Sequence, residues 1–309
     1  MGLDVVFMGT PEFAVPALRR LAASKHAVRA VVTAPDRPRG RGHAVRPTPV
    51  AIAACELGIP VLKPESIKGE EFLSAMRATG ANAVAVVAYG KIIPSRVLAW
   101  PKYGCVNVHP SLLPKYRGAS PIHAPLLAGD SATGVTTMYM DEGLDTGDIL
   151  LQEEVPIAPG ENAGDLHDRL ATLGAELLVR TFDLMEEGLL VRIPQDHARA
   201  SYAPKVEKEK IPWELPAHAV AARINGLSPH PGAYTLMGSV RLKALRAVVG
   251  GPNGGAAPGR VVEASGRGIA VACGSGSVVL LEVQPEGKAP MSAGDFARGY
   301  AAQLAGGLA

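Results

Sequence analysis

The sequence LDVVFMGTPEFAVPALRRLAA, residues 3–23, decides the fold of the N-terminal half. Residues 3–8 are apolar with a single acidic exception, which is typical of a strand buried on both faces. Residues 13–23 instead place their apolar side chains at helical spacing. We therefore expect a buried strand followed by a helix, the repeating unit of an α/β sheet.

The same alternation continues toward the middle of the chain. We expect strands over residues 28–33, 83–89, 105–109 and 134–140, and a helix over residues 49–57. Strands that are apolar almost throughout, and that are separated by helices, predict a parallel sheet covered on both faces. Right-handed crossovers then produce an open, doubly wound sheet, which binds ligands at the carboxyl ends of its strands.

The C-terminal half follows a different pattern. A long amphipathic helix is expected over residues 163–187, and the weakly patterned, proline-interrupted stretch 190–213 is interpreted as a linker. Beyond it, short β-rich runs separated by glycines predict a small barrel or sandwich. The runs are residues 233–236, 239–249, 259–264, 269–273 and 278–283, between helices expected over residues 217–225 and 293–304. The predicted domains are therefore residues 1–189 and 214–309.

The composition narrows the class of protein. Of 309 residues, 47% are hydrophobic and 19% are charged, as expected for a globular protein with a sizeable core. The net charge is only +2, so any contact with RNA requires a local basic patch. Three scattered cysteines without a CxxC pair argue against a disulfide framework or a zinc ribbon. Without a secretory signal or an apolar run of membrane length, we expect a cytoplasmic protein that does not enter the membrane.

Asn107, His109 and Asp145 form the densest polar group that the pattern brings together. Asn107 and His109 are two residues apart at a strand end, so their side chains share one face. Asp145 lies in the glycine-flanked turn 143–148, and we expect the ends of strands 105–109 and 134–140 to converge at one edge of the sheet. An amide donor for an oxyanion, an imidazole for proton transfer and a carboxylate to orient it suit acyl transfer to an amine. With no activated nucleophile beside them, direct transfer is the simpler interpretation.

Other interpretations of these residues stay open at this point. A histidine at a strand end is most often structural, and Asp145 suits an Asx turn. A mononuclear metal site formed by His109, His123 and Asp145 is a third alternative. No compact ligand motif supports that site, so we expect no metal.

Two motifs around these residues resemble the signatures of the folate-dependent formyltransferase family: NVHPSLLPKYRG at residues 107–118 and GLDTGDIL at residues 143–150. The resemblance implies a Rossmann-like parallel sheet, with Asn107, His109 and Asp145 as the catalytic residues. It implies 10-formyltetrahydrofolate as formyl donor, a co-substrate that is not permanently bound. It also implies a folate site lined by Ser111, Leu112, Leu113 and Pro114.

The mechanism implied by the resemblance is attack of the acceptor amine on the formyl carbon at N10 of the folate. Asn107 and protonated His109 would stabilise the developing oxyanion. Asp145 would orient His109 and help to remove the amine proton. The acceptor itself is not defined by these two motifs, because several relatives with different acceptors share them.

Three further stretches resemble the members of this family that act on methionyl-tRNA. FMGTPEFA at residues 7–14 resembles their start. The loop 36–46 carries four arginines and one aspartate, a local charge of +3, and resembles their tRNA-contacting insertion. SYAPK at residues 201–205 and the tail from residue 284 resemble their C-terminal half, whose second domain is an oligonucleotide-binding-like β-barrel. The residues then expected to bind tRNA are Arg37, Arg39, Arg41, Arg46, Lys205, Lys243, Arg246 and Lys288.

The resemblance covers nearly the whole chain and implies formyl transfer to methionyl initiator tRNA in translation initiation. From residue 206 onward there are ten basic and seven acidic residues, a mild surplus that agrees with RNA contact. One departure is Lys210-Ile211-Pro212-Trp213, where relatives commonly carry Asp before Trp. No feature requires an oligomer, so we expect a monomer.

Two rival functions remain. One is formyl transfer to a nucleotide or an amino sugar, against which the β-rich C-terminal half without a dehydrogenase or epimerase extension argues. The other is a catalytically silent folate-binding or RNA-binding module. The presence of Asn107, His109 and Asp145 together argues against that loss of activity.

Overall fold

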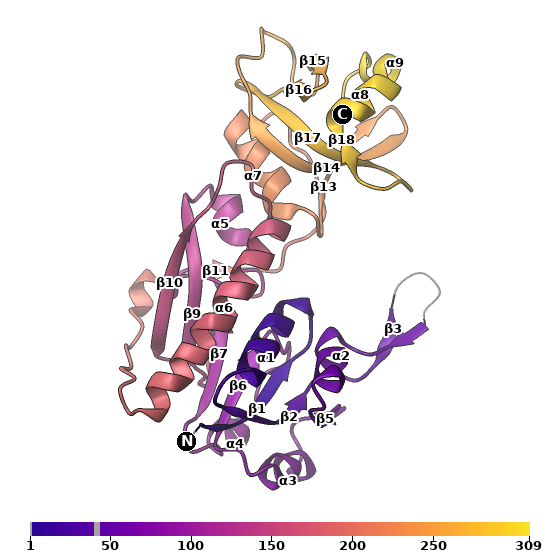
Figure 1. Ribbon diagram of the computed structural model, residues 1–309. Coiled ribbons are helices and arrows are strands. Elements are labelled where there is room, and N and C mark those ends of the chain that lie inside the picture. The colour runs from indigo at the N-terminus through magenta and orange to yellow at the C-terminus, as the bar shows by residue number, and fades with distance from the viewer. Residues whose placement is uncertain (1, 40–43) are drawn as a thin grey trace. The chain divides into compact units, whose positions relative to one another are not determined.

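The computed structural model describes residues 2–39 and 44–309, and it divides into two compact units (Figure 1). The first unit comprises Met1–Gly118, Gly134–Glu154 and Asp168–Tyr202. The second comprises Ala119–Thr133, Val155–His167 and Ala203–Ala309. The units are therefore interleaved along the sequence, and each is built from three segments.

The first unit is built on a seven-stranded sheet. Its order is β10-β9-β7-β6-β1-β2-β5. The strands are β1 (Asp4–Gly9), β2 (Ala27–Val32), β5 (Val61–Leu62), β6 (Ala83–Val87), β7 (Cys105–His109), β9 (Ala132–Tyr139) and β10 (Ile149–Pro156). Two short ladders accompany them: β3 (Arg37–Arg39) with β4 (Ala44–Arg46), and β8 (Arg117–Gly118) with β11 (Tyr202–Ala203).

Helices alternate with these strands, as expected of an α/β sheet. They are η1 (Glu12–Ala14), α1 (Val15–Ala22), α2 (Pro49–Glu56), α3 (Glu70–Ala78), α4 (Ser95–Leu98), α6 (Ala163–Glu186) and η2 (His197–Arg199). The helix expected over residues 13–23 is thus divided into a 3-10 turn and an α-helix, while α3 and α4 were not predicted. The α/β fold class is confirmed.

The direction of the strands departs from the sequence expectation at one point. β5, β2, β1, β6 and β7 are mutually parallel in the order of the sheet, but β7 and β9 are antiparallel, with His109 opposite Thr136 and Val106 opposite Tyr139. The expected convergence of the two strand ends at one edge is therefore wrong, because β9 ends beside the start of β7. Burial on both faces looks the same in a sequence whichever way a strand runs.

Both faces of the sheet are covered. On one face, Phe72 and Met76 of α3 pack against apolar side chains of β1 and β6. On the other, α1 and α6 lie together, joined by an ion pair between Arg20 and Glu176 at 2.7 Å (Figure 1). A β-carbon on Gly174 of α6 would lie 2.7 Å from Cγ1 of Val108. Val108 therefore faces α6, and its neighbours along β7 face the opposite side.

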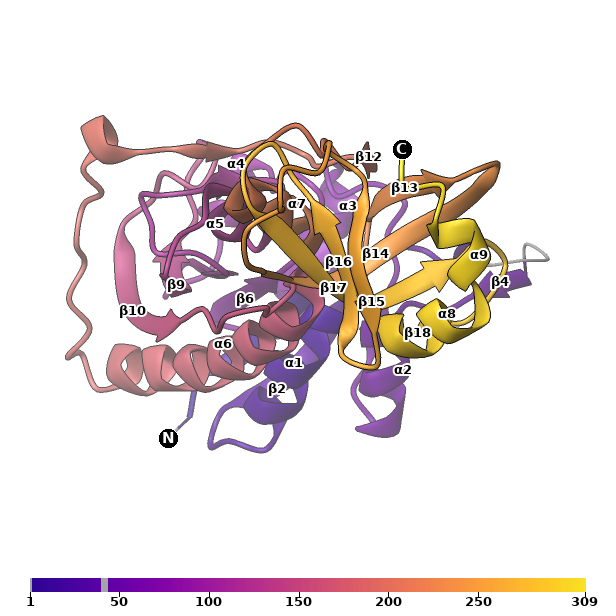
Figure 2. The same ribbon diagram turned by 90° about the horizontal axis from the view of Figure 1, so that it is seen from above.

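The second unit is a mostly-strand domain, which confirms the sequence expectation. Its strands are β12 (Glu209–Lys210), β13 (Ala233–Met237), β14 (Val240–Val249), β15 (Val261–Ser265), β16 (Gly268–Ala272), β17 (Ser277–Pro285) and β18 (Met291–Ser292), in one sheet with an antiparallel centre. Its helices are α5 (His123–Ala128), α7 (Ala217–Leu227), α8 (Ala293–Gly299) and α9 (Ala301–Leu304). The helix expected over residues 293–304 breaks at Tyr300, which has φ −129°. Helix α8 packs beside β18 (Figure 2).

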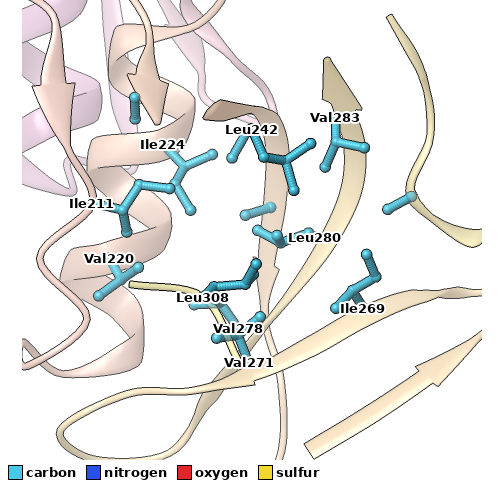
Figure 3. Close-up of a cluster of buried hydrophobic side chains, with 14 of the residues drawn as sticks. Ile211, Val220, Ile224, Leu242, Ile269, Val271, Val278, Leu280, Val283 and Leu308 are labelled. Carbon is cyan, nitrogen blue, oxygen red and sulfur yellow. The ribbon is translucent and has the colours of Figure 1, made fainter. Parts of the chain in front are cut away.

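The core of the second unit is apolar and continuous. Ile224 of α7 packs with Leu242 of β14 and with Leu280 of β17, all three fully buried (Figure 3). Leu127 of α5 packs against the same cluster. In the part of the chain that the structure describes, no helix is both long and apolar enough to cross a lipid bilayer.

Candidate active site

The site lies at the carboxyl ends of parallel strands in the first unit, as doubly wound sheets predict. Gly9 ends β1 opposite Val87, the last residue of β6, and the neighbouring β7 ends at His109. A β-carbon on Gly9 would lie 2.9 Å from the Val87 carbonyl oxygen, so the two backbones approach too closely for any larger residue. The strand-to-helix turn that follows is tied down by a bond from Thr10 Oγ1 to the Tyr89 carbonyl at 3.2 Å.

His109 is buried, and each of its ring nitrogens lies near a polar group. Nε2 donates a hydrogen bond to the carbonyl oxygen of Tyr116 at 3.0 Å, and Nδ1 lies 3.7 Å from Oδ2 of Asp145. Burial lowers the pKa of His109, although the Asp145 carboxylate opposes this, and the positive charge of Arg117 lowers it further. Burial and Arg117 therefore oppose protonation of the imidazole, while Asp145 favours it, and the Nε2 bond to a carbonyl oxygen requires a proton on Nε2.

Asp145 reaches His109 because its loop folds back toward β7, not because of the strand ends. Its backbone has φ 53°, and Tyr116 on the other side of His109 has φ 62°. Such left-handed conformations are strained in residues other than glycine, and they concentrate at functional sites. The peptide N–H of Gly118 donates to Asp145 Oδ2 at 2.8 Å, which holds the carboxylate in place.

Asn107 is the third member of the predicted trio. It is half-buried on β7, on the same face as His109. Among the described residues, none forms a hydrogen bond with its side-chain amide. The amide is therefore free to donate to a bound reactant. The structure thus brings His109 and Asp145 together and leaves Asn107 available beside them.

Two buried residues that sequence reasoning missed support this trio. Arg117 is only 2% exposed, and its Nη2 and Nε donate to Oε1 of Gln195 at 2.6 and 3.1 Å. The amide nitrogen of Gln195 donates in turn to the carbonyls of Asp145 and Gly147, at 2.9 and 2.7 Å. Arg117 lies within the quoted motif 107–118, which could have pointed to it. A glutamine in an irregular stretch carries no periodic signal.

The segment that contributes Gln195 was expected to be part of a linker. Ile193 and Ile149 exchange backbone hydrogen bonds of 2.8 and 2.9 Å, which joins the segment to β10. Ser201 accepts from the N–H of Tyr116 through its hydroxyl at 3.0 Å, and from the N–H of Arg117 through its carbonyl at 2.9 Å. Residues up to Tyr202 therefore belong to the first unit and hold its loops.

The run expected to line a folate site is partly internal. The Ser111 hydroxyl donates to the Lys115 carbonyl at 2.6 Å, and the Leu113 N–H donates to Thr136 Oγ1 at 3.1 Å. Both Ser111 and Leu113 are buried, whereas Leu112 and Pro114 are half-buried. The accessible surface of the run therefore comes from Leu112 and Pro114.

The residues proposed for the alternative metal site do not form one by proximity. His123 belongs to the second unit, where its Nε2 bonds to the carbonyl of His230 at 3.1 Å. In the described ranges 2–39 and 44–309, no group of three or more His, Cys, Asp or Glu side chains is arranged to hold a metal ion.

The arginine-rich loop forms a two-stranded hairpin at its base. Arg37 of β3 and Arg46 of β4 pair directly across this hairpin, and both side chains are exposed. Arg39 is the last residue of β3. Arg41 lies outside the described residues.

The basic residues expected to bind tRNA from the second unit differ in their surroundings. Lys205 is exposed, but Arg246 is ion-paired to Asp165 at 2.7 Å. Lys243 donates to the Pro229 carbonyl at 2.5 Å. Lys288 donates to the hydroxyl of Tyr300 at 2.7 Å. The charged groups of Arg246, Lys243 and Lys288 therefore already have partners within the protein.

A basic and aromatic group that sequence reasoning missed is formed by Tyr234 of β13, Arg241 of β14 and Lys208, which precedes β12. The guanidinium of Arg241 is 4.8 Å from the ring centroid of Tyr234, and the ammonium of Lys208 is 6.0 Å from it. Lys208 and Arg241 are exposed, and Tyr234 is half-buried. Such a group offers charge for phosphates next to a ring on which a base can stack.

Comparison with known proteins agrees with this fold. The formyl transferase family profile matches residues 3–182, and the profile of the formyl transferase C-terminal domain matches residues 205–301. A solved structure of WlaRD, a sugar 3N-formyl transferase with dTDP and 5-N-formyl-THF, superposes with a TM-score of 0.64 at 16% identity, covering 94% of this chain and 100% of that one. That likeness concerns the fold alone. The chain belongs to the formyl transferase family.

The relatives define the branch of the family. A methionyl-tRNA formyltransferase of Pelotomaculum thermopropionicum is 50% identical over 300 residues, covering 96% of each chain. A methionyl-tRNA formyltransferase of Syntrophus aciditrophicus is 49% identical over the same length and coverage. Within the formyl transferases, the chain is a member of the methionyl-tRNA formyltransferase branch.

Proposed function

We propose that the protein transfers the formyl group of 10-formyltetrahydrofolate to the α-amine of methionyl initiator tRNA. The product is N-formylmethionyl-tRNA, used for translation initiation in the cytoplasm. The observation that carries this proposal is the His109–Asp145 pair beside the free amide of Asn107, at the carboxyl edge of a formyl transferase sheet. The names of the relatives at 50% and 49% identity support the acceptor.

The geometry suits direct transfer. The amine nitrogen forms a bond to the formyl carbon, and the Asn107 amide donates to the oxygen that becomes negative. The amine must then lose a proton, and N10 of the folate must gain one as the C–N10 bond breaks. Nδ1 of His109 and the Asp145 carboxylate lie 3.7 Å apart and can carry that proton between the two nitrogens. No acyl-enzyme is required.

The folate is a co-substrate that binds and leaves in each turnover. We assign its contact surface on this loop to Leu112 and Pro114, since these keep accessible surface. Ser111 and Leu113 do not contact the folate in this assignment. They fix the conformation of the loop through their hydrogen bonds to Lys115 and Thr136. The bound 5-N-formyl-THF of WlaRD supports a reduced folate as donor.

The tRNA contacts are assigned by exposure and charge. Arg37, Arg46 and Lys205 are exposed and suit phosphate contact, and Arg39 and Arg41 belong to the same arginine-rich stretch of the sequence. To bind RNA, three other basic residues would have to break bonds within the protein: Arg246, Lys243 and Lys288. We therefore expect them to contribute less to the affinity for tRNA. Tyr234 with Lys208 and Arg241 is added as a stacking contact. We expect the protein to act as a monomer.

The proposed function is tested by incubating the protein with 10-formyltetrahydrofolate and charged initiator tRNA. We expect formylmethionyl-tRNA, and a fall in kcat by a factor of about 10² to 10⁴ in Asp145→Asn and His109→Ala, because each removes a proton carrier. Glu142→Gln changes an exposed carboxylate of the same loop and is the matched control.

Three outcomes would contradict the proposal. Near-wild-type kcat in both variants would remove His109 and Asp145 from the chemistry. Formylation of an amino sugar or of glycinamide ribonucleotide, but not of tRNA, would assign the protein to another branch. Tight folate binding without any transfer would make it a binding module.

A further inference from the structure

Gln195 stands out among its neighbours because a polar side chain is buried where apolar ones are exposed. Between residues 191 and 199, all of which the structure describes, Gln195 alone is buried, at 6% exposed. Val191 and Ile193 are 68% and 53% exposed. Burial of an amide is unfavourable unless its hydrogen bonds are satisfied, so the position points to a specific role.

Both ends of the Gln195 side-chain amide form hydrogen bonds with residues around the candidate active site. Its oxygen accepts two bonds from the Arg117 guanidinium, and its nitrogen donates two bonds to the backbone of the Asp145 loop. One amide therefore joins a buried cation to the strained residue that faces His109. The two donors and the two acceptors require both ends of the amide, so no other side chain of this length satisfies the arrangement.

Arg117 needs this partner. Among the described residues, no carboxylate pairs with its guanidinium, and its other side-chain contact is Nδ1 of His197 at 3.2 Å. Because its hydrogen-bond partners are neutral, the positive charge of Arg117 is not cancelled by a negative one and acts on neighbouring groups. The charge of Arg117 acts on His109, where it opposes the influence of the Asp145 carboxylate on the pKa of the imidazole.

We propose that Gln195 is a positioning residue for formyl transfer, which clamps the Asp145 loop onto the buried Arg117 guanidinium and so holds the carboxylate against His109. The proposal rests on the proposed function above. The peptide bond of Asp145 is held by Gln195, and its carboxylate by Gly118 N–H, so the loop is restrained at two points. Loss of one point lets the carboxylate move relative to Nδ1, which already lies at 3.7 Å.

The first test is Gln195→Glu, which keeps the shape of the side chain. A glutamate still accepts from Arg117, but it sets an oxygen against the carbonyls of Asp145 and Gly147 in place of two N–H donors. We expect kcat to fall by about 100-fold while KM for the folate and for the charged tRNA changes less than about threefold, because misplacement of about 1 Å costs that much in rate. Gln195→Leu, which removes both sets of bonds, is expected to lose at least as much.

The second readout distinguishes positioning from general destabilisation. In histidine-labelled protein, the NMR titration of His109 should move to higher pH in Gln195→Glu, because the new carboxylate neutralises Arg117. Gln195→Leu, which leaves the charges unchanged, should move it less. A change in folding alone would not produce this order.

The matched control is Arg192→Ala. Arg192 ties the same two segments through a solvent-exposed ion pair with Asp148 at 2.9 Å, so kcat should stay within about twofold of the wild type. Unchanged kcat in Gln195→Glu, or an equal loss in Arg192→Ala, would overturn the proposal, and so would an unshifted His109 titration in folded Gln195→Glu. A wild-type protein that transfers no formyl group would instead contradict the proposed function, whatever the variants do.

Discussion

Among single residues, His109 is the one whose surroundings bear most directly on the proposed proton transfer. The residue is 4% exposed, its ring lies beside the Asp145 carboxylate and the Tyr116 carbonyl, and the charge of Arg117 acts on it. Burial disfavours the imidazolium, and Arg117 adds to this effect. A neutral imidazole can accept the amine proton at once, whereas an imidazolium would first have to lose its own.

We expect the pKa of His109 in the folded protein to lie below its ordinary value of 6.5. As pH falls from 6.5 toward the folded value, the unfolded chain binds a proton that the folded one excludes, so stability is lost in that window. His26 and His123, whose pKa burial also lowers, contribute in the same direction. An NMR titration assigned with a His109→Gln variant measures the midpoint directly.

The same titration in Asp145→Asn provides the control. Removing the carboxylate removes the main influence that raises the pKa of His109, so the midpoint should fall further. A midpoint above 6.5 in the wild type, or an upward shift in Asp145→Asn, would mean that the protonated form dominates.

At the scale of the element, the β3–β4 hairpin concentrates charge on a short ladder. Arg37 and Arg46 lie opposite each other, and like charges in directly opposed positions destabilise a ladder. The pair of arginines therefore does not stabilise the hairpin by its charges. An anionic partner that neutralises both would offset the repulsion, as RNA phosphates would.

Replacing both arginines, as Arg37→Ala with Arg46→Ala, should raise KM for charged tRNA by about tenfold or more, because each charged hydrogen bond contributes about 1.5 kcal/mol or more. KM for the folate should stay within about twofold. The slope of log KM against log salt should fall by about two, because each arginine is expected to bind one phosphate.

The control for this pair is Arg77→Ala with Arg96→Ala. Both of these arginines pair with Glu70 on the surface of the same unit, and the variant removes the same net charge. An equal rise in KM for tRNA in the control would assign the effect to overall charge and not to the hairpin.

At the scale of the whole molecule, the two units are interleaved along the chain. Segments 119–133 and 155–167 belong to the second unit, although they lie within the N-terminal half of the sequence. Leu127 packs against the second core, and Asn162 donates to the Leu245 carbonyl at 3.2 Å. Asp165 is ion-paired with Arg246. A cut in the linker therefore does not separate two self-sufficient pieces.

We expect a fragment of residues 1–202 to unfold about 5 °C or more below the full chain and to bind an apolar dye. It loses the core against which Leu127 packs and the partners of Asn162 and Asp165. Calorimetry and dye fluorescence measure both effects. Mixing it with the fragment 203–309 should restore the stability, and a fragment that melts like the full chain would contradict this view.

The amino-acid sequence by itself determined most of the long strands and helices and the fold class, and its motifs predicted the chemistry of the site. Periodicity marked the strands from residue 3 onward because burial on two faces is a local property of a short run. The motifs around Asn107, His109 and Asp145 marked the reaction because these side chains lie in short contiguous stretches. The domain boundaries at residues 189 and 214 and the roles of the site residues remain predictions.

Tertiary structure alone decided the direction of β9, the burial that lowers the pKa of His109, the internal pairing of Arg246 and the support from Gln195. Each of these depends on residues far apart in the sequence. Strand direction, desolvation and the partner of a buried amide are set by what packs alongside, and a local pattern carries no record of that. The chemistry could therefore be read along the chain, while the geometry that makes it work appears only when the chain is folded.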